Sequence, residues 1–334
     1  MRFEICFQTN LEFQIPNSER MSNKEVKSKQ ELRIVYMGTP EFAVPSLEKL
    51  VEAGWNVVGV ITAPDKPQGR GQKLVGSPVK QAAERLGLTI LQPTNLKSPE
   101  FQQELKHLNA DLQIVVAFRM LPESVWNMPP MGTFNLHASL LPDYRGAAPI
   151  NWAIINGETE TGVTTFFLKH EIDTGSIIFQ EKVSILPEDD LGTIYEKLMT
   201  IGSELVLKTV EAISKNEVNP KVQDESKALH HAPKIFKETC KIDWNQSAES
   251  IHNLVRGLSP YPAAWTEFQD KTCKIYKTSV SKENLNGKKP GEWESDGKTY
   301  LSFQAGNGSL KILELQLEGK KRMSIEDLLR GLKL

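Results

Sequence analysis

The stretch "LRIVYMGTPEFAVPSLEKLVEAGWNVVGVIT", residues 32–62, carries the pattern that decides the fold. Its first seven residues are mostly aliphatic and end in a glycine, which is typical of a short buried strand. Apolar residues then recur at helical spacing as far as Gly54, where the helix is expected to stop. A second aliphatic run, residues 55–62, follows at once. The stretch therefore predicts a strand, a helix and a second strand.

The same alternation of strand and helix continues as far as residue 215. Several of the strands are apolar on both faces, which indicates a mainly parallel sheet covered by helices on both sides. We therefore predict an α/β fold with a doubly wound, Rossmann-like sheet, whose ligands bind beyond the carboxyl ends of the strands. Further strands are expected at residues 89–93, 111–118, 132–138, 161–168 and 175–185, and further helices at residues 77–87, 98–109, 148–157 and 190–215.

Composition changes near residues 216–234, where polar residues and prolines show no periodicity. Such a stretch is typical of a linker. After it come one helical segment and several short strands divided by turns, which predicts a small antiparallel barrel of the OB type. We therefore expect a flexible N-terminal extension over residues 1–31, an α/β catalytic domain over 32–215, a linker over 216–234 and an OB-like domain over 235–334.

The bulk composition excludes several classes of protein. A net charge of -2 gives no global attraction for nucleic acid, so any such partner must be held by local patches. The three cysteines are far apart and lack metal-ligand spacing, which favours reduced thiols. No apolar run reaches the ~18 residues of a membrane span, and the N-terminal residues do not resemble a signal peptide. We expect a cytoplasmic monomer, with Met21 as an alternative start.

The stretch "FNLHASLLPDYRGAAP", residues 134–149, places two polar side chains in an apolar run. Asn135 and His137 are two residues apart, so on a strand they point to one face. At the carboxyl end of a parallel strand that face opens onto the ligand crevice. An amide donor beside an imidazole suits oxyanion stabilisation and acid–base chemistry. The alternative is a satisfied pair of polar residues in the core.

The stretch "HEIDTG", residues 170–175, places Asp173 in a turn between two strands. A carboxylate there is a natural partner for a histidine across the crevice, where it would fix the tautomer and stabilise the imidazolium. The alternative is an aspartate that caps its own turn. The first glycine-containing turn, "YMGTPEF" at residues 36–42, lacks the G-x-G-x-x-G fingerprint and so disfavours NAD or FAD.

Basic residues gather in two places. The loop "PDKPQGRGQK", residues 64–73, is rich in glycine, proline and positive charge, and such a loop can follow a phosphate backbone. Small barrels often bind oligonucleotides, and this one carries several lysines. In both places the alternative is an ordinary solvated surface. The residues that we expect to contact nucleic acid are Lys66, Arg70 and Lys73 in the loop and Lys274 and Lys321 on the barrel.

Taken in order, these motifs resemble the folate-dependent formyltransferase family. N-x-H followed by S-L-L-P-x-Y-R-G and then D-T-G is similar to that family in general. Three further features resemble the branch that acts on methionyl-tRNA: the G-T-P-x-F turn, the P-D-x-P-x-G-R-G loop followed by "SPVK", and a tail with "KIDWNQSAESIHNLVRGLSPYPAAW" and "GKKRMSIEDLLRG". The resemblance runs from about residue 32 to the C-terminus.

The resemblance implies that a formyl group is transferred from 10-formyltetrahydrofolate to the α-amine of methionyl initiator tRNA, with no NAD and no metal. It implies that Asn135, His137 and Asp173 are the catalytic residues. The segment "AFRMLP", residues 117–122, stands where the family often has "AYGLILP" in its folate pocket. The side chains expected at the folate are those of Ser139, Leu140, Leu141, Pro142, Met120 and Leu121.

Three other functions are compatible with parts of the sequence. A formyltransferase acting on an amino-sugar nucleotide or another small amine would share the three catalytic residues but would not need the basic loop and the barrel. An RNA-binding protein without catalysis would use the loop and the barrel but not the Asn, His and Asp. A nicotinamide oxidoreductase is disfavoured by the missing glycines.

Overall fold

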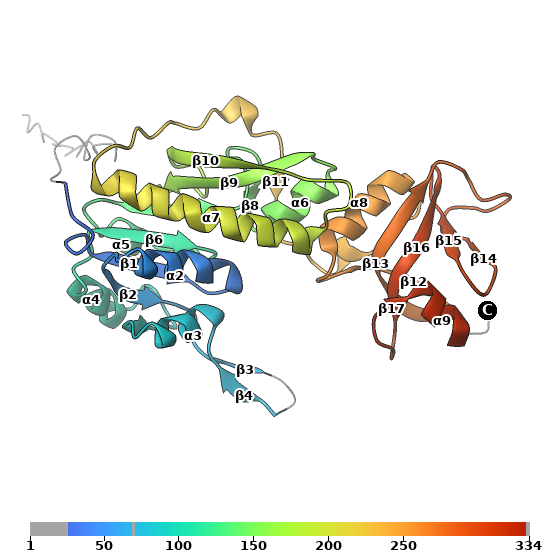
Figure 1. Ribbon diagram of the computed structural model, residues 1–334, viewed down its shortest axis with the longest axis horizontal. Helices are drawn as coiled ribbons and strands as arrows, with labels where there is room; N and C mark the ends of the chain where they lie inside the picture. The colour runs from blue at the N-terminus through green and yellow to red at the C-terminus, as the bar shows by residue number, and fades with distance from the viewer. Residues whose placement is uncertain (1–25, 69–70, 332–334) are drawn as a thin grey trace, which may run out of the picture.

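The computed structural model describes residues 26–68 and 71–331, which form a larger and a smaller part arranged side by side along the long axis (Figure 1). The larger part, blue to yellow in Figure 1, is a sheet with helices on both faces, and the smaller part is an antiparallel half-barrel. The predicted fold class, a doubly wound, mainly parallel sheet followed by an OB-like β domain, is therefore confirmed.

Within the described residues, the main sheet has seven strands: β1 (Ile34–Gly38), β2 (Val57–Ile61), β5 (Ile90–Leu91), β6 (Leu112–Val116), β7 (Thr133–His137), β9 (Glu160–Phe167) and β10 (Ile177–Ser184). Their order is β10-β9-β7-β6-β1-β2-β5. The strands from β7 to β5 are parallel, whereas β9 and β10 add an antiparallel edge. From β1 the chain first adds β2 and β5 on one side of the sheet, and then adds β6, β7, β9 and β10 on the other side. The carboxyl ends of β1 and β6 therefore form a topological switch point, which is where ligands bind in such sheets.

The two faces of this sheet have separate apolar cores, because successive residues of a strand point to opposite sides. Ile34 and Tyr36 of β1 face one core, and Val35 and Met37 face the other. The first core is covered by α2 (Val44–Glu52, after the 3-10 turn Glu41–Ala43), α3 (Pro78–Arg85), α6 (Pro149–Ile155) and α7 (Leu191–Ser214). The second is covered by α4 (Pro99–His107) and α5 (Glu123–Trp126).

Serine caps begin two of these helices, at the residues where the sequence predicts each helix to start. The Ser77 hydroxyl accepts a hydrogen bond from the Lys80 N–H, and the Ser98 hydroxyl accepts one from the Phe101 N–H. Each cap is followed by a proline at the first helical position, where a missing N–H costs nothing. Local sequence therefore fixes where α3 and α4 start.

The smaller part packs its own core between a helix and a sheet. Its sheet has the order β12-β13-β16-β15-β14, with β17 paired to β16. In the part of the chain that the structure describes, the outer strands of this order do not pair with each other, so the barrel is half open. Its elements are the 3-10 turn Glu238–Cys240, α8 (Ala248–Leu258), β12 (Ala264–Phe268), β13 (Lys271–Ser281), β14 (Trp293–Ser295), β15 (Leu301–Gln304), β16 (Ser309–Leu317), β17 (Met323–Ser324) and α9 (Ile325–Gly331).

Helix α8 joins the two parts, since it packs on α6 as well as on the half-barrel. The Asn151 amide of α6 donates to the carbonyl oxygen of Gly257 at 2.8 Å. Gly257 also permits this close approach, because a Cβ there would lie 2.6 Å from the Ile155 side chain. On the other side, the Arg256 guanidinium donates to the carbonyl oxygen of Asp189 at 2.8 Å.

The segment 216–234, which we predict as a linker, crosses the larger part before it reaches α8. It contains the 3-10 turn Glu225–Lys227 and the short strand β11 (His231–Ala232). β11 pairs in parallel with β8 (Arg145–Gly146), and so this segment lies directly against the turn that follows β7.

The basic loop at residues 64–73 is more regular than predicted. β3 (Lys66–Gln68) and β4 (Lys73–Val75) form an antiparallel hairpin, which extends away from the body of the molecule (Figure 1). Its base is fixed because the Asp65 carboxylate accepts hydrogen bonds from Gln92 and Lys80, which lower the pKa of Asp65. The sequence predicts a loop without strands here, and the structure corrects this for residues 66–68 and 73–75.

The predicted N-terminal extension is described only from Val26 onward. There the Lys27 N–H donates to the carbonyl oxygen of Ser214 at 3.1 Å, and the Lys27 ammonium contacts Asp111 at 2.5 Å. These residues therefore lie against the larger part, beside the end of α7 and the start of β6. Among the described residues, no helix is both long enough and apolar enough to cross a membrane.

Candidate active site

Two polar side chains share one face of β7, as the sequence predicts. Phe134 and Leu136 pack into the core beneath α7, so Asn135 and His137 point to the opposite side. Asn135 is half-buried, and among the described residues no group hydrogen-bonds its side-chain amide. That amide is therefore free to donate to a ligand.

The imidazole of His137 is held by a backbone carbonyl. Its Nε2 lies 2.9 Å from the carbonyl oxygen of Tyr144, and the residue is 8% exposed. A carbonyl oxygen can only accept, so we assign a proton to Nε2. The ring also meets Phe166 edge to face, with centroids 6.5 Å apart. Nδ1 is therefore the ring nitrogen that is left to exchange a proton with a substrate.

Asp173 approaches that nitrogen from the loop between β9 and β10. Its Oδ2 lies 4.0 Å from His137 Nδ1, which is beyond hydrogen-bond length but within reach of a charge interaction. The same oxygen accepts a hydrogen bond from the Gly146 N–H at 3.1 Å. The structure thus brings Asn135, His137 and Asp173 to the same end of the sheet, and the catalytic role of each stays a prediction.

Two glycines allow the loops around Asp173 to come this close. A Cβ on Gly175 would lie 1.6 Å from the carbonyl oxygen of Phe167, so the D-T-G turn requires glycine. Gly146 has φ +127°, and a Cβ there would lie 2.5 Å from the carbonyl oxygen of Ala232. Asp173 itself has φ +55°, a left-handed conformation that costs energy in a residue other than glycine. Strain of this kind gathers at functional sites.

The turn after β7 contains four of the residues predicted at the folate. Ser139 is buried, and its hydroxyl donates to the carbonyl oxygen of Asp143 at 2.7 Å. Leu141 and Pro142 are buried and joined by a cis peptide bond, and Leu140 is half-buried. The Leu140 side chain lies over Gly162 of β9, where an added Cβ would meet it at 2.5 Å. The contact of these four residues with folate stays a prediction.

The segment after β6 contains the other two residues predicted at the folate, Met120 and Leu121. Met120 is 74% exposed, and Leu121 is half-buried against the second core. Arg119 belongs to the segment "AFRMLP", which differs from the usual "AYGLILP" of the family. Its guanidinium donates to the carbonyl oxygens of Thr94 (at 2.9 Å) and Pro93. Burial lowers the pKa of this guanidinium. The segment is therefore tied to the loop before α4, and Met120 is presented to solvent at the carboxyl end of β6.

The residues predicted to contact tRNA lie on both parts of the molecule. Lys66 and Lys73 are exposed on the two strands of the hairpin, whereas Arg70 lies outside the described residues. On the half-barrel, Lys321 is exposed in the turn between β16 and β17. Lys274 is half-buried, and its ammonium reaches a backbone carbonyl at 3.4 Å. The hairpin lysines and Lys321 are thus accessible to a large substrate, and Lys274 is less so.

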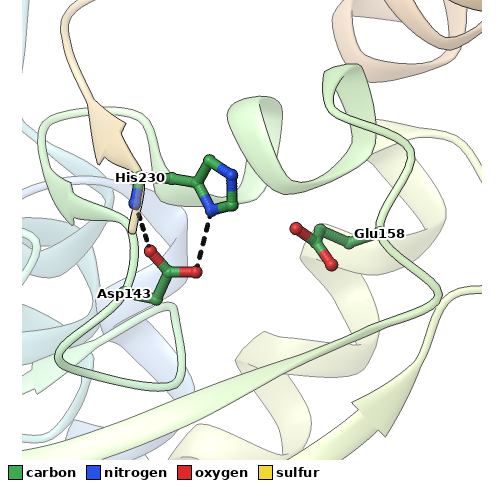
Figure 2. A group of neighbouring side chains, drawn as sticks. All are labelled: Asp143, Glu158 and His230. Atoms are coloured by element: carbon green, nitrogen blue, oxygen red, sulfur yellow. Dashed lines mark hydrogen bonds and ion pairs between the residues drawn. The ribbon is translucent and has the colours of Figure 1, made fainter. Parts of the chain in front are cut away.

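Three side chains with metal-ligand atoms meet beside the turn. Among the described residues, Asp143, Glu158 and His230 offer ligand atoms within 4.8 Å of one another. Figure 2 shows His230 joined to Asp143, through its backbone N–H (2.6 Å) and its ring Nδ1 (3.0 Å). Glu158 accepts instead from the Tyr144 hydroxyl at 2.7 Å. Both carboxylates have partners in the protein, so we assign the cluster to holding the turn and assign no metal.

Tyr144 connects this cluster to His137. Its carbonyl oxygen accepts from His137 Nε2, and its ring stacks on His230 with centroids 5.1 Å apart. Burial, together with the hydrogen bond to Glu158, raises the pKa of the Tyr144 phenol, which therefore stays protonated as a donor. Tyr144 has φ +56°, so a second strained residue contacts the imidazole.

Family models match both parts of this chain. The formyl transferase model matches residues 32–210, and the model of the formyl transferase C-terminal domain matches residues 234–333. Together they cover the described residues except 26–31 and 211–233. The chain belongs to the formyl transferase family.

Relatives of this formyl transferase are similar over almost their whole length. Methionyl-tRNA formyltransferases from Bacteroides fragilis and Parabacteroides distasonis are 55% and 56% identical to it, over 92% and 91% of this chain and 97% of each relative. Among solved structures, an N-formyltransferase from Helicobacter canadensis has a TM-score of 0.63 and 21% identity, covering 87% of this chain and 99% of that one. At that identity the likeness shows the fold alone.

Sequence reasoning missed several residues that hold this formyl transferase site together. Asp143 lies in the stretch at residues 134–149, but the sequence led us to assign functional roles only to other residues of that stretch. Gln223 and His230 lie in the segment predicted as a linker, which has no helical or strand periodicity. A polar residue that is buried by an irregular segment leaves no pattern in the sequence, so only the three-dimensional contacts find it.

Proposed function

We infer that this chain transfers the formyl group of 10-formyltetrahydrofolate to the α-amino group of methionyl initiator tRNA. The observation that carries this inference is the 55% identity to a methionyl-tRNA formyltransferase over 97% of the relative's length. Both parts of the chain match family models, so the agreement includes the C-terminal domain as well as the catalytic sheet. The monomeric state and the cytoplasmic location stay predictions.

The site suits nucleophilic attack on a formyl group. Attack by the α-amine moves negative charge onto the formyl oxygen, and the free amide of Asn135 supplies a donor for that oxygen. Its lack of a partner among the described residues fits this part, because no protein hydrogen bond has to break. Met120 and the turn after β7 flank the same end of the sheet, where the pterin of the donor would lie.

His137 moves the proton that the reaction must transfer. The amine loses a proton as the new C–N bond forms, and N10 of the folate gains one as the old bond breaks. Nδ1 is the nitrogen free for both steps, because Tyr144 holds Nε2. Asp173, 4.0 Å away, stabilises the imidazolium that exists between the two steps. A positioned acid–base group of this kind contributes about 10²–10⁴-fold to the rate.

The experiment that tests the function measures formyl transfer to three acceptors. Methionyl initiator tRNA, the same tRNA without methionine and an amino-sugar nucleotide are each incubated with enzyme, with and without 10-formyltetrahydrofolate. We expect donor consumption only with methionyl-tRNA. A higher kcat/KM for the amino-sugar nucleotide would instead assign the chain to small-amine formylation.

The β3–β4 hairpin is expected to hold the tRNA by its phosphates. Changing both Lys66 and Lys73 to alanine should raise KM for methionyl-tRNA about tenfold and reduce the slope of log kcat/KM against log salt by about two. The value of kcat and KM for the folate should stay unchanged, because neither lysine lies at the chemical site. Steady-state kinetics at several salt concentrations measure all four quantities.

A matched control removes the same charge elsewhere on the catalytic part. Lys97 and Lys106 are exposed near α4, on a different surface. Their double alanine variant should keep both the KM for tRNA and the salt slope. Equal effects of the two double variants would mean that net charge, and not the hairpin, attracts the tRNA.

A further inference from the structure

Residues 221–232, which we name the strap, bind both loops of the active site. At one end, Lys221 exchanges two backbone hydrogen bonds with Ile177, both 2.8 Å long. At the other end, β11 pairs with β8 directly after the β7 turn. The strap comes from beyond α7 in the chain, yet it lies against the loop that carries Asp173 and against the turn that holds His137.

Gln223 is the strap residue most deeply engaged with the site. It is only 5% exposed, and its amide makes four hydrogen bonds. The Nε2 group donates to the carbonyl oxygens of Asp173 and Gly175, both at 2.8 Å. The Oε1 atom accepts from Arg145 Nη2 and Nε at 2.6 and 3.1 Å. One side chain therefore fixes the backbone on both sides of residue 174 and ties it to the arginine of the β7 turn.

Arg145 is held on its other side by the same strap. Its Nη1 and Nη2 each donate to a carboxylate oxygen of Glu225 at 2.8 Å, and this guanidinium lowers the pKa of Glu225. The next residue, Gly146, donates its N–H to Asp173 Oδ2. Arg145 and Gly146 thus connect the strap to the carboxylate of Asp173. The Arg145 guanidinium binds Gln223 and Glu225 of this chain.

The far end of the strap supports the histidine in a similar way. His230 binds Asp143 through two hydrogen bonds and stacks on Tyr144 (Figure 2). The backbone N–H of Tyr144 donates in turn to the carbonyl oxygen of His230 at 2.9 Å. Because the carbonyl oxygen of Tyr144 holds His137 Nε2, the strap contacts the supports of both members of the His137–Asp173 pair.

We propose that the strap completes the active site and that Gln223 is the positioning residue for Asp173, a proposal that rests on the function inferred above. Asp173 has a left-handed backbone and no regular strand around it, so its own sequence does not hold it in place. The Gln223 amide holds it through two hydrogen bonds, donated to the carbonyl oxygens of Asp173 and Gly175. Misplacing a catalytic group by about 1 Å can cost ~10²-fold in rate, so the anchor acts on kcat and not on substrate binding.

Gln223→Glu separates the positioning role from general stability. A glutamate keeps the size of the side chain and keeps an oxygen toward Arg145, whose positive charge stabilises the carboxylate. Its second oxygen replaces Nε2 and faces the two carbonyl oxygens of Asp173 and Gly175, which it cannot bind. The variant therefore breaks the anchor of the loop and leaves the contact with Arg145.

The experiment compares the wild type, Gln223→Glu, Asp173→Asn and the double variant in formylation of methionyl-tRNA. We expect Gln223→Glu to lower kcat about 10- to 100-fold, with KM for both substrates within about threefold of wild type. In the Asp173→Asn background the same change should lower kcat by less than about threefold, since residues of one network are not additive. A Gln223→Glu enzyme with wild-type kcat, or full additivity, would overturn the proposal.

Two further measurements keep the result interpretable. Amide hydrogen exchange of residues 168–176 should accelerate in Gln223→Glu, and unchanged exchange there would contradict the anchor whatever the activity. Gln113 is a buried glutamine of β6, 1% exposed and away from the site, and Gln113→Leu should keep wild-type kcat. A wild type that does not formylate methionyl-tRNA would refute the proposed function. The hydrogen-exchange measurement would still show whether Gln223 anchors the loop that carries Asp173.

Discussion

Replacing His137 with alanine is expected to lower kcat for formyl transfer by about 10²–10⁴-fold, the range for loss of a positioned acid–base group. The amine must lose a proton and N10 must gain one, and in the described part of the chain Nδ1 of His137 is the ring nitrogen left free for this beside Asp173. KM for 10-formyltetrahydrofolate should change little. Single-turnover kinetics with saturating donor measure the chemical step directly.

A second variant tells proton transfer from support of the turn. In His137→Gln the terminal amide can still donate to the carbonyl oxygen of Tyr144, but it cannot carry a proton between two nitrogens. We expect it to be as slow as His137→Ala while recovering thermal stability. Recovery of kcat in His137→Gln would show that the imidazole only holds the turn, and the proton would need another carrier.

Local sequence signals account for most of the fold. Apolar runs with β-branched residues identified β1, β2 and β6, and serine caps identified the starts of α3 and α4. These signals work because side-chain period and capping are local properties of the chain. The hairpin at residues 66–75 was missed, since its two strands, KPQ and KLV, are short and bury little apolar surface.

The site was predictable only where it lies on a regular element. Asn135 and His137 share a face because a strand has a period of two, and this follows from sequence alone. The distance from His137 to Asp173 depends on Gly146, Gly175 and the strap, which meet through contacts distant in sequence. Gln223 has no local signature, because what matters is which carbonyl oxygens face it after folding.

Replacing Asn135 with alanine is expected to lower kcat by about 10²–10³-fold, which corresponds to the ~2.7–4 kcal/mol lost with one oxyanion donor. The amide has no partner among the described residues, so its removal leaves no protein group unsatisfied. The midpoint of thermal unfolding should therefore stay close to that of the wild type. KM for both substrates should also be nearly constant, because the donor acts on charge that develops only during attack.

Asn151 provides the matched control, since it is another half-buried asparagine but already has a partner in the protein. Its amide donates to the carbonyl oxygen of Gly257 between α6 and α8. Asn151→Ala should therefore cost about 1 kcal/mol of unfolding free energy and leave kcat near wild type, the opposite pattern to Asn135→Ala. If Asn135→Ala instead lost stability and kept kcat, the amide would be structural, and the formyl oxygen would need a donor from elsewhere in the cleft.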